Sequence, residues 1–267
     1  MKRFIYYPLL LIVLISFSCK NHERPKHIKI NIVETSDIHG AIFDYDFIKD
    51  RNSFGSLSKV QSYIKELKDS HHVILVDNGD ILQGQPIVYY SNYENVNKPH
   101  ICAQVMNYME YDAATVGNHD IEAGHDVYDK LKNEFNFPWL AANAINTETG
   151  KPYFEPYTII NKKGIKIAVL GLITPGIPKW LPKELWEGIE FEDMVESAKK
   201  WVPQILEDEK PDLLVGLFHA GYDYTYENKS YETYKNENAS LIVAEQVPGF
   251  DVVFIEGFRE GIKKSGV

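Results

Sequence analysis

Short apolar runs alternate with longer amphipathic segments along this chain. Four of the runs have the length of buried strands: 28–33, 73–76, 111–115 and 213–218. Each of them is followed within a few residues by Asp, Asn or His. Apolar residues recur at helical spacing over 55–70 and 98–111, which lie between the first three runs. Connections of that length allow neighbouring strands to be parallel, so the pattern predicts an α/β fold.

The second half of the chain continues this pattern. Strand-like runs at 138–143, 166–172 and 251–255 and an amphipathic helix at 191–206 complete the predicted elements. The chain has 267 residues, of which 44% are hydrophobic and 25% charged, as is usual for globular proteins. Because no internal repeat or low-complexity linker divides the chain, we expect one domain over 28–267.

The amino terminus carries a different pattern. Lys2 and Arg3 precede a mostly apolar run that is short for a membrane-spanning helix but typical of an export signal. Cys19, at the end of the run, resembles the lipidated cysteine of bacterial lipoproteins. We therefore expect a lipoprotein signal peptide at 1–18 and a tether at 19–27. The mature protein is then exported to the cell envelope, at the periplasm or the cell surface, and held on the membrane through lipidated Cys19.

Charge and cysteine content narrow the class of partner. A formal net charge of −10 argues against binding of duplex nucleic acid, which needs a surplus of basic residues. A small anionic substrate then needs local positive charge, which metal ions can supply. The chain has two cysteines, so it has no disulfide framework and no Cys-x-x-Cys zinc site. With Cys19 lipidated, we expect Cys102 to be a buried small residue on a helix.

Candidate chemistry gathers where the strand-like runs end. Asn118 offers a carbonyl oxygen to a hard cation, His119 can move a proton near neutral pH, and Gly117 lets the backbone turn closely around both. Taken alone, this Gly-Asn dipeptide is equally consistent with a simple turn. Ligand-type residues also follow the other three runs: Asp37, His39, Asp80 and His219. Parallel strands place such residues along one edge of a sheet, so the pattern indicates a ligand cluster there.

Four ordered segments carry a family resemblance: Asp37-x-His39, Gly79-Asp80 with Gln83-Gly84, Gly117-Asn118-His119-Asp120 and His219-Ala220-Gly221. They resemble the signature segments of the calcineurin-like metallophosphoesterases, in the branch of bacterial 5'-nucleotidases, UDP-sugar hydrolases and 2',3'-cyclic nucleotide phosphodiesterases. The resemblance spans 28–254 and implies an α-β-β-α sandwich, that is, a sheet core with flanking helices. It also implies hydrolysis of nucleotides or related phosphate esters through attack of a metal-activated water.

The resemblance implies a set of metal ligands. Asp37 and His39 would hold one of two divalent ions, and Asp80 would bridge both. Asn118 and His219 would hold the second ion. Oxygen and imidazole ligands of this kind suit Zn, Mn, Fe or Co, so the metal remains open at this point.

A further pair of residues is implied for catalysis. His119 would lie beside the phosphate, where it would stabilise developing charge and assist the leaving oxygen. Its carboxylate partner in the related nucleotidases stands three residues farther on, which here is Glu122, while Asp120 follows directly. We favour Glu122, for which a simple acid at a helix start is the alternative.

The resemblance breaks near the carboxyl end. Members of the family place a Gly-His-x-His segment after a strand such as 251–255, but this chain has no histidine after His219. We expect a domain that is incomplete there, without the last metal-ligand motif or the carboxyl-terminal substrate domain. Each ion would keep three protein ligands if Asp80 is counted twice. Glu256 offers an oxygen in this segment, but we do not assign it as a ligand.

Two alternatives to the enzyme remain open. A truncated relative with little or no activity would bind metal or phosphate without turnover. A surface lipoprotein that binds some other ligand would leave the four motifs unexplained.

Several residues near the motifs need a decision. We expect His125 to open a helix and not to bind metal, while Asn143 is a candidate for lining the site. Tyr89, Tyr90 and Tyr93 form an aromatic cluster that could stack on a substrate. Packing of their loop onto the core is the favoured prediction.

Overall fold

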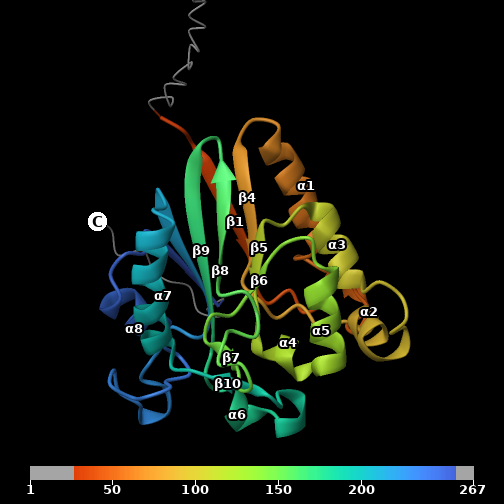
Figure 1. Cartoon of the computed structure of the whole chain (residues 1–267). Helices are drawn as coiled ribbons and strands as arrows, with labels where there is room; N and C mark the ends of the chain where they lie inside the picture. Colours follow the sequence, from red (N-terminus) through yellow and green to blue (C-terminus); the bar gives the residue numbers. More distant parts are fainter. Residues whose placement is uncertain (1–26, 257–267) are drawn as a thin grey trace, which may run out of the picture.

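The computed structural model describes residues 27–256 as two face-to-face sheets with helices on both outer sides (Figure 1). The predicted signal peptide, Cys19 and almost all of the tether lie outside these residues, as does the chain after Glu256. Within the described residues, no helix has both the length and the apolar character needed to cross a bilayer. The predicted α-β-β-α sandwich is confirmed.

The first sheet has the strand order β1-β4-β5-β6, and all neighbouring strands are parallel. Its strands are β1 (Ile30–Thr35), β4 (His72–Asp77), β5 (Ala113–Thr115) and β6 (Trp139–Leu140). The predicted strand at 138–143 is therefore shorter than expected, because the chain turns after Leu140.

The second sheet has the order β12-β11-β9-β8. Its strands are β8 (Tyr157–Lys162), β9 (Ile165–Ile173), β11 (Leu213–His219) and β12 (Val252–Ile255). β9, β11 and β12 are parallel, whereas β8 forms an antiparallel hairpin with β9. Two short ribbons lie outside the sheets: β2 (Tyr45–Asp46) with β3 (Arg51–Asn52), and β7 (Ala144–Asn146) with β10 (Ile189–Phe191).

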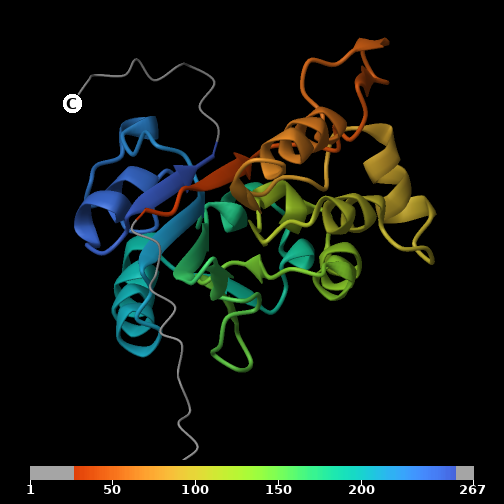
Figure 2. The same cartoon turned by 90° about the horizontal axis from the view of Figure 1, so that it is seen from above.

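Helices cover the outer face of each sheet, as the view in Figure 2 also shows. Those on the first sheet are α1 (Leu57–Lys68), α3 (Ile101–Met109) and α5 (His125–Glu134). Those on the second are α7 (Met194–Asp208) and α8 (Ser240–Gln246). The predicted helix at 191–206 begins later, because Ile189–Phe191 pairs with β7 and the Asp193 side chain caps α7.

Strand β4 is buried on both faces, which explains its continuous run of apolar residues at 73–76. Val73 and Leu75 face the helices over the first sheet, while Ile74 and Val76 face the second sheet. A strand buried on both faces has no polar face to show, unlike a strand at the surface of a protein. The carboxyl ends of the parallel strands meet at the lower end of the molecule in Figure 1, where α4 (Asn118–Glu122) and α6 (Ile177–Trp180) lie.

Candidate metal centre

The predicted ligands lie at this end of the sandwich and come from both sheets. Asp37 and His39 follow β1, and Asp80 follows β4. Asn118 opens α4 directly after β5, and His219 is the last residue of β11 on the second sheet. The structure thus gathers residues that are as far apart in sequence as 37 and 219.

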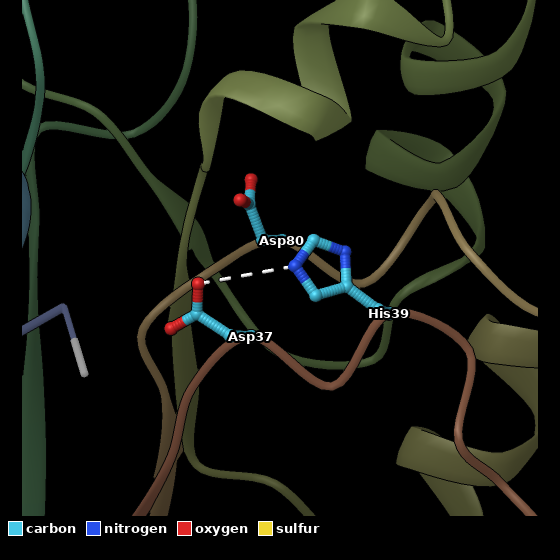
Figure 3. Close-up of side chains that lie close together, drawn as sticks. All are labelled: Asp37, His39 and Asp80. Atoms are coloured by element: carbon cyan, nitrogen blue, oxygen red, sulfur yellow. Dashed lines mark ion pairs between the residues drawn. The ribbon is translucent and has the colours of Figure 1, made fainter. Parts of the chain in front are cut away.

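Asp37, His39 and Asp80 form one close group (Figure 3). One ligand atom of each lies within 4.8 Å of the others, and Asp37 Oδ1 is 3.9 Å from His39 Nε2. Two carboxylates and an imidazole are a donor set that suits Zn, Mn, Fe or Co. The three side chains therefore fit a divalent cation.

The backbone around this group is unusual. Asp37, His39 and Asp80 all adopt left-handed conformations, with φ of 52°, 48° and 64°. Such conformations are uncommon for residues other than glycine and tend to occur at functional sites. Main-chain hydrogen bonds hold the two loops together, because Asp37 N donates to Gly79 O at 3.0 Å and His39 N donates to Asp80 O at 2.9 Å.

Two glycines allow these loops to approach closely. A Cβ at Gly117 would lie 2.2 Å from Asp80 Oδ1, and a Cβ at Gly79 would lie 2.7 Å from Gly117 N. Neither position has room for a side chain, so the Gly-Asp and Gly-Asn motifs need their glycines for space. Gly79 also has a φ of +95°, which favours glycine on conformational grounds.

Asp120 organises the Asp80 loop instead of serving His119. Its buried carboxylate accepts four backbone N–H groups, from Asp80, Ile81, Leu82 and Gly117, at 2.8–3.1 Å. Burial and the nearby Asp80 carboxylate raise the pKa of Asp120, while these donors oppose that effect. The sequence alone does not predict this role. The available signal was an acid at the third position of a helix that starts at a glycine.

His219 presents one ring nitrogen to the site. Its Nδ1 donates to Asn78 O at 2.6 Å, which leaves Nε2 3.0 Å from Asn118 Oδ1 and 3.4 Å from Asp80 Oδ1. Burial would lower the pKa of His219, but Asp80 and other partners raise it to about 10. A positive charge is thus favoured beside Asp80, as expected where a cation would bind. Asn78 also donates its side-chain amide to Phe218 O.

Glu256 reaches the same site from the end of β12. Its Oε2 lies 3.9 Å from His219 Nε2, and it lines a pocket together with Asn118 and His119. The sequence alone does not assign this residue as a ligand. The structure nevertheless places its carboxylate where it could supply an oxygen to a cation held by Asn118 and His219.

His119 and Glu122 lie in direct contact. Glu122 Oε2 hydrogen-bonds His119 Nδ1 and also accepts Gln83 Nε2 at 3.0 Å. His119 N donates to Asp80 Oδ1 at 2.8 Å, and its ring meets the His39 ring edge-on at 5.3 Å between centroids. With Nδ1 engaged, Nε2 is the nitrogen left for a substrate.

Two neighbouring pockets share His119, Glu122, Trp180 and Leu181. The first measures about 530 Å³ and is lined by Tyr89 and Tyr93, whereas the second measures about 510 Å³ and includes Glu237 and Glu256. The predicted packing of the tyrosine loop onto the core is wrong for these side chains. Tyr89, Tyr90 and Tyr93 are 60%, 50% and 47% exposed.

The remaining neighbours behave as follows. Asn143 does not line the pockets beside the metal centre, because its buried side chain bonds Ile173 and Glu192 backbone groups. That prediction is wrong. His125 opens α5 as predicted, and Cys102 is buried on α3 as predicted.

Comparison of this chain with known proteins identifies a matching family. The model of the calcineurin-like phosphoesterase family matches residues 30–255. The trifunctional nucleotide phosphoesterase protein YfkN of Bacillus subtilis is 31% identical over 252 residues, which cover 88% of this chain and 17% of YfkN. The 5'-nucleotidase of Vibrio cholerae is 32% identical over 240 residues, which cover 88% of this chain and 40% of that enzyme.

Solved structures agree with the sequence match. The crystal structure of calcineurin-like phosphoesterase YfkN from Bacillus subtilis has a TM-score of 0.73 at 30% identity, and the match covers 84% of this chain and 70% of that one. The chain spans 17% and 40% of the two curated relatives described above. With the family match running from the first strand to the last, this chain belongs to the calcineurin-like phosphoesterases.

Proposed function

We propose that this protein is a metal-dependent phosphoesterase that hydrolyses nucleotides or related phosphate esters. The observation that carries the proposal is the close group of Asp37, His39 and Asp80, with His119 packed against it. The names of the nucleotide phosphoesterase and 5'-nucleotidase relatives support a nucleotide as the substrate.

We propose two divalent ions at this site. Asp37 and His39 would hold one, Asn118 and His219 the other, and Asp80 lies close enough to both groups to bridge them. When bound, such ions acidify a water molecule and neutralise the oxygens around phosphorus. The Asn78 carbonyl fixes the His219 tautomer, so that Nε2 faces the site.

His119 would act on the leaving group, by donating a proton to the departing oxygen and stabilising the negative charge that develops there. Glu122 holds its Nδ1, which orients the ring and leaves Nε2 as the nitrogen that can meet a substrate. An Nε2–H group would donate to a phosphate oxygen or to the departing oxygen. Gln83 holds Glu122 in turn, so the pair is positioned before a substrate arrives.

We further propose export and lipid anchoring through Cys19. The support is the sequence pattern of Lys2 and Arg3, an apolar run and then Cys19. Metabolic labelling with a palmitate analogue should mark the wild-type protein in a bacterial host. Cys19→Ala should remain unlabelled, and equal labelling of both would contradict the anchor.

Phosphate release from p-nitrophenyl phosphate and AMP tests the function. We expect release that depends on added Mn²⁺ or Zn²⁺ and that Asp80→Ala abolishes. Calorimetric uptake of metal without any release would favour the alternative of a binding relative without turnover. Absence of metal uptake that depends on Asp37 and Asp80 would favour a lipoprotein of another kind.

A further inference from the structure

We propose that the pocket walled by Tyr89, Tyr93 and Trp180 is a stacking site for the planar ring of the substrate. The inference rests on the proposed phosphoesterase function and names where the part of the substrate beyond the phosphate would bind. It also assigns a recognition role to residues of the same domain that carries the metal ligands.

The walls come from two separate segments. Tyr89 ends α2 (Pro86–Tyr89), and Tyr93 lies in the helical turn that follows (Tyr90–Glu94). Trp180 ends α6, and in Figure 1 α2 and α6 flank α4 at this end of the molecule. All three side chains line one pocket, although nearly ninety residues separate Tyr93 from Trp180.

The pocket begins at the proposed catalytic residues. His119 and Glu122 line it, so a leaving group bonded to a phosphate beside His119 would extend into it. Its volume of about 530 Å³ falls within the ~300–1,000 Å³ usual for small-molecule sites. The other lining residues are largely apolar: Leu82, Ala123, Leu181, Pro182 and Leu185.

The aromatic side chains are exposed without being loose. Tyr89 and Trp180 are 60% and 49% exposed, yet the Tyr89 and Tyr93 rings meet edge-on at 5.0 Å between centroids. A Cβ at Gly176 would lie 2.7 Å from the Trp180 ring, so the indole rests directly on the backbone. Tyr and Trp present rigid flat surfaces at small entropic cost, which suits stacking.

Charge distinguishes this pocket from its neighbour. None of the described residues lining the aromatic pocket is Lys or Arg, so it is suited to a neutral ring and not to a second phosphate. The neighbouring pocket contains Glu237 and Glu256. Glu237 is paired with Lys229 at 2.9 Å and Lys179 at 3.4 Å, which leaves few free cations there for an anionic substrate.

Several polar groups of the pocket are already engaged. Asn92 donates to Leu82 O at 2.8 Å and its Oδ1 lies 2.8 Å from His100 Nε2, while Gln83 Nε2 donates to Glu122. Few hydrogen bonds therefore remain to read the edge of a base. Stacking tolerates any flat ring, so we expect purine, pyrimidine and nitrophenyl esters to be accepted with little discrimination.

The first test compares kcat/KM for AMP with kcat/KM for glycerol 2-phosphate, which has no ring. The ratio should fall about 10-fold in Trp180→Ala and about as much in the double variant Tyr89→Ala/Tyr93→Ala, within the range for loss of a stacking partner. Trp180→Phe and the double Phe variant should restore most of the ratio, because each keeps a ring. Tyr108→Ala, at a 76% exposed position on α3, should leave it unchanged.

The second test needs no turnover. Saturation-transfer NMR should show binding of adenosine, but not of ribose, to the metal-free full chain, and the signal should disappear in Trp180→Ala. This result stands even if no phosphate ester is hydrolysed, so failure of the proposed function would be recognised separately. The inference is overturned if adenosine binds equally well when Tyr89, Tyr93 and Trp180 are replaced by Ala. It is also overturned if the Phe variants lose the preference for AMP as fully as the Ala variants.

Discussion

The two sheets contribute to the candidate metal centre in different ways. On the first sheet, Asp37, His39 and Asp80 lie on loops joined to one another by main-chain hydrogen bonds. The second sheet contributes two side chains at strand ends, His219 and Glu256. One half of the centre is thus built within a single sheet, whereas the other half exists only when the two sheets pack together.

Buried polar contacts reinforce this difference. Asp120 holds four N–H groups around Asp80, and the His100–Asn92 pair holds the carbonyl of Leu82 in the same loop. On the second sheet, His219 relies on the carbonyl of Asn78, which belongs to the first sheet. The ligand geometry on the first sheet is therefore supported at many points, and that on the second at few.

The largest effect is expected at the residue shared by both halves. Asp80→Asn keeps the size of the side chain but removes the charge beside His219 and Asp37. Loss of a contact that merely supports a metal ligand costs about 10–100-fold, so loss of a direct ligand should exceed that in both metal affinity and phosphate release. Calorimetry with Mn²⁺ measures the first and phosphate assays the second. Asp208→Asn, at an exposed position on α7, is the matched control; retention of both bound ions in Asp80→Asn would rule out a bridging role.

The support of the first half should depend on pH through His100. Its Nε2 faces Asn92 Oδ1 and its Nδ1 accepts Cys102 N, an arrangement that requires the neutral ring. Burial first, and Lys130 second, lower the pKa of His100 from 6.5 to about 4. The unfolded chain therefore binds a proton first, and stability falls as pH drops from about 6.5 to 4.

At pH 4 this contribution reaches about 3 kcal/mol of lost unfolding free energy relative to pH 7.5. Urea unfolding gives the free energy of unfolding of metal-free wild type and of His100→Gln at both pH values. The loss between pH 7.5 and pH 4 should be larger in wild type, and the difference between the two losses measures the contribution of His100. His27→Gln, at an exposed site, should behave like wild type. Parallel pH curves for wild type and His100→Gln would contradict the assignment.

Gly117→Ala should damage the first half without removing a ligand. The added Cβ would lie 2.2 Å from Asp80 Oδ1, so either the carboxylate or the α4 start must move. We expect a loss of about 1–3 kcal/mol in stability from overpacking, together with weaker metal binding. Gly55→Ala adds the same atom where nothing lies within 4 Å and should change neither quantity. Metal binding at wild-type strength in Gly117→Ala would show that the close approach is dispensable.

The smallest effect should follow from Glu256→Gln on the second sheet. If this carboxylate supplies an oxygen to the ion beside His219, one of two binding steps should weaken by about 10-fold while the other stays unchanged. The loss should be smaller than in Asp80→Asn, because Gln keeps one oxygen and Glu256 would serve a single ion. Calorimetric titration with Mn²⁺ resolves the two steps. Glu207→Gln, exposed on α7, serves as the control. If both binding steps are unchanged in Glu256→Gln, then His219 is the only one of these two second-sheet side chains that contributes to metal binding.

Much of the fold could be predicted because its strands are buried on both faces. The apolar run at 73–76 has no polar alternation, and the structure places it at the centre of the sandwich. The gathering of ligands was predictable for a related reason: parallel strands end at the same edge, so Asp37, Asp80 and Asn118 had to lie near one another.

The misses concern contacts that sequence does not encode locally. The position of Asp120 in its helix indicates the bond to Gly117 N, but the three bonds to main-chain groups about forty positions away have no local signal in the sequence. Tyr89 and Tyr93 are aromatic residues, which are often buried in a core. They border a pocket because of the three-dimensional path of their loop, which the sequence does not reveal. Asn143 looked like a site residue at a strand end, but three backbone partners occupy its amide.

Asn78 has a mechanical consequence for the sandwich. It joins the two sheets through its carbonyl and its side-chain amide, both at the end where the strands finish. Thermal breathing should therefore separate the sheets first at the opposite end, near Ile30 and Leu213, where the strands begin. Hydrogen exchange should be faster at those strand starts than beside His219, which would leave the edge that carries His219 the last part of the interface to loosen.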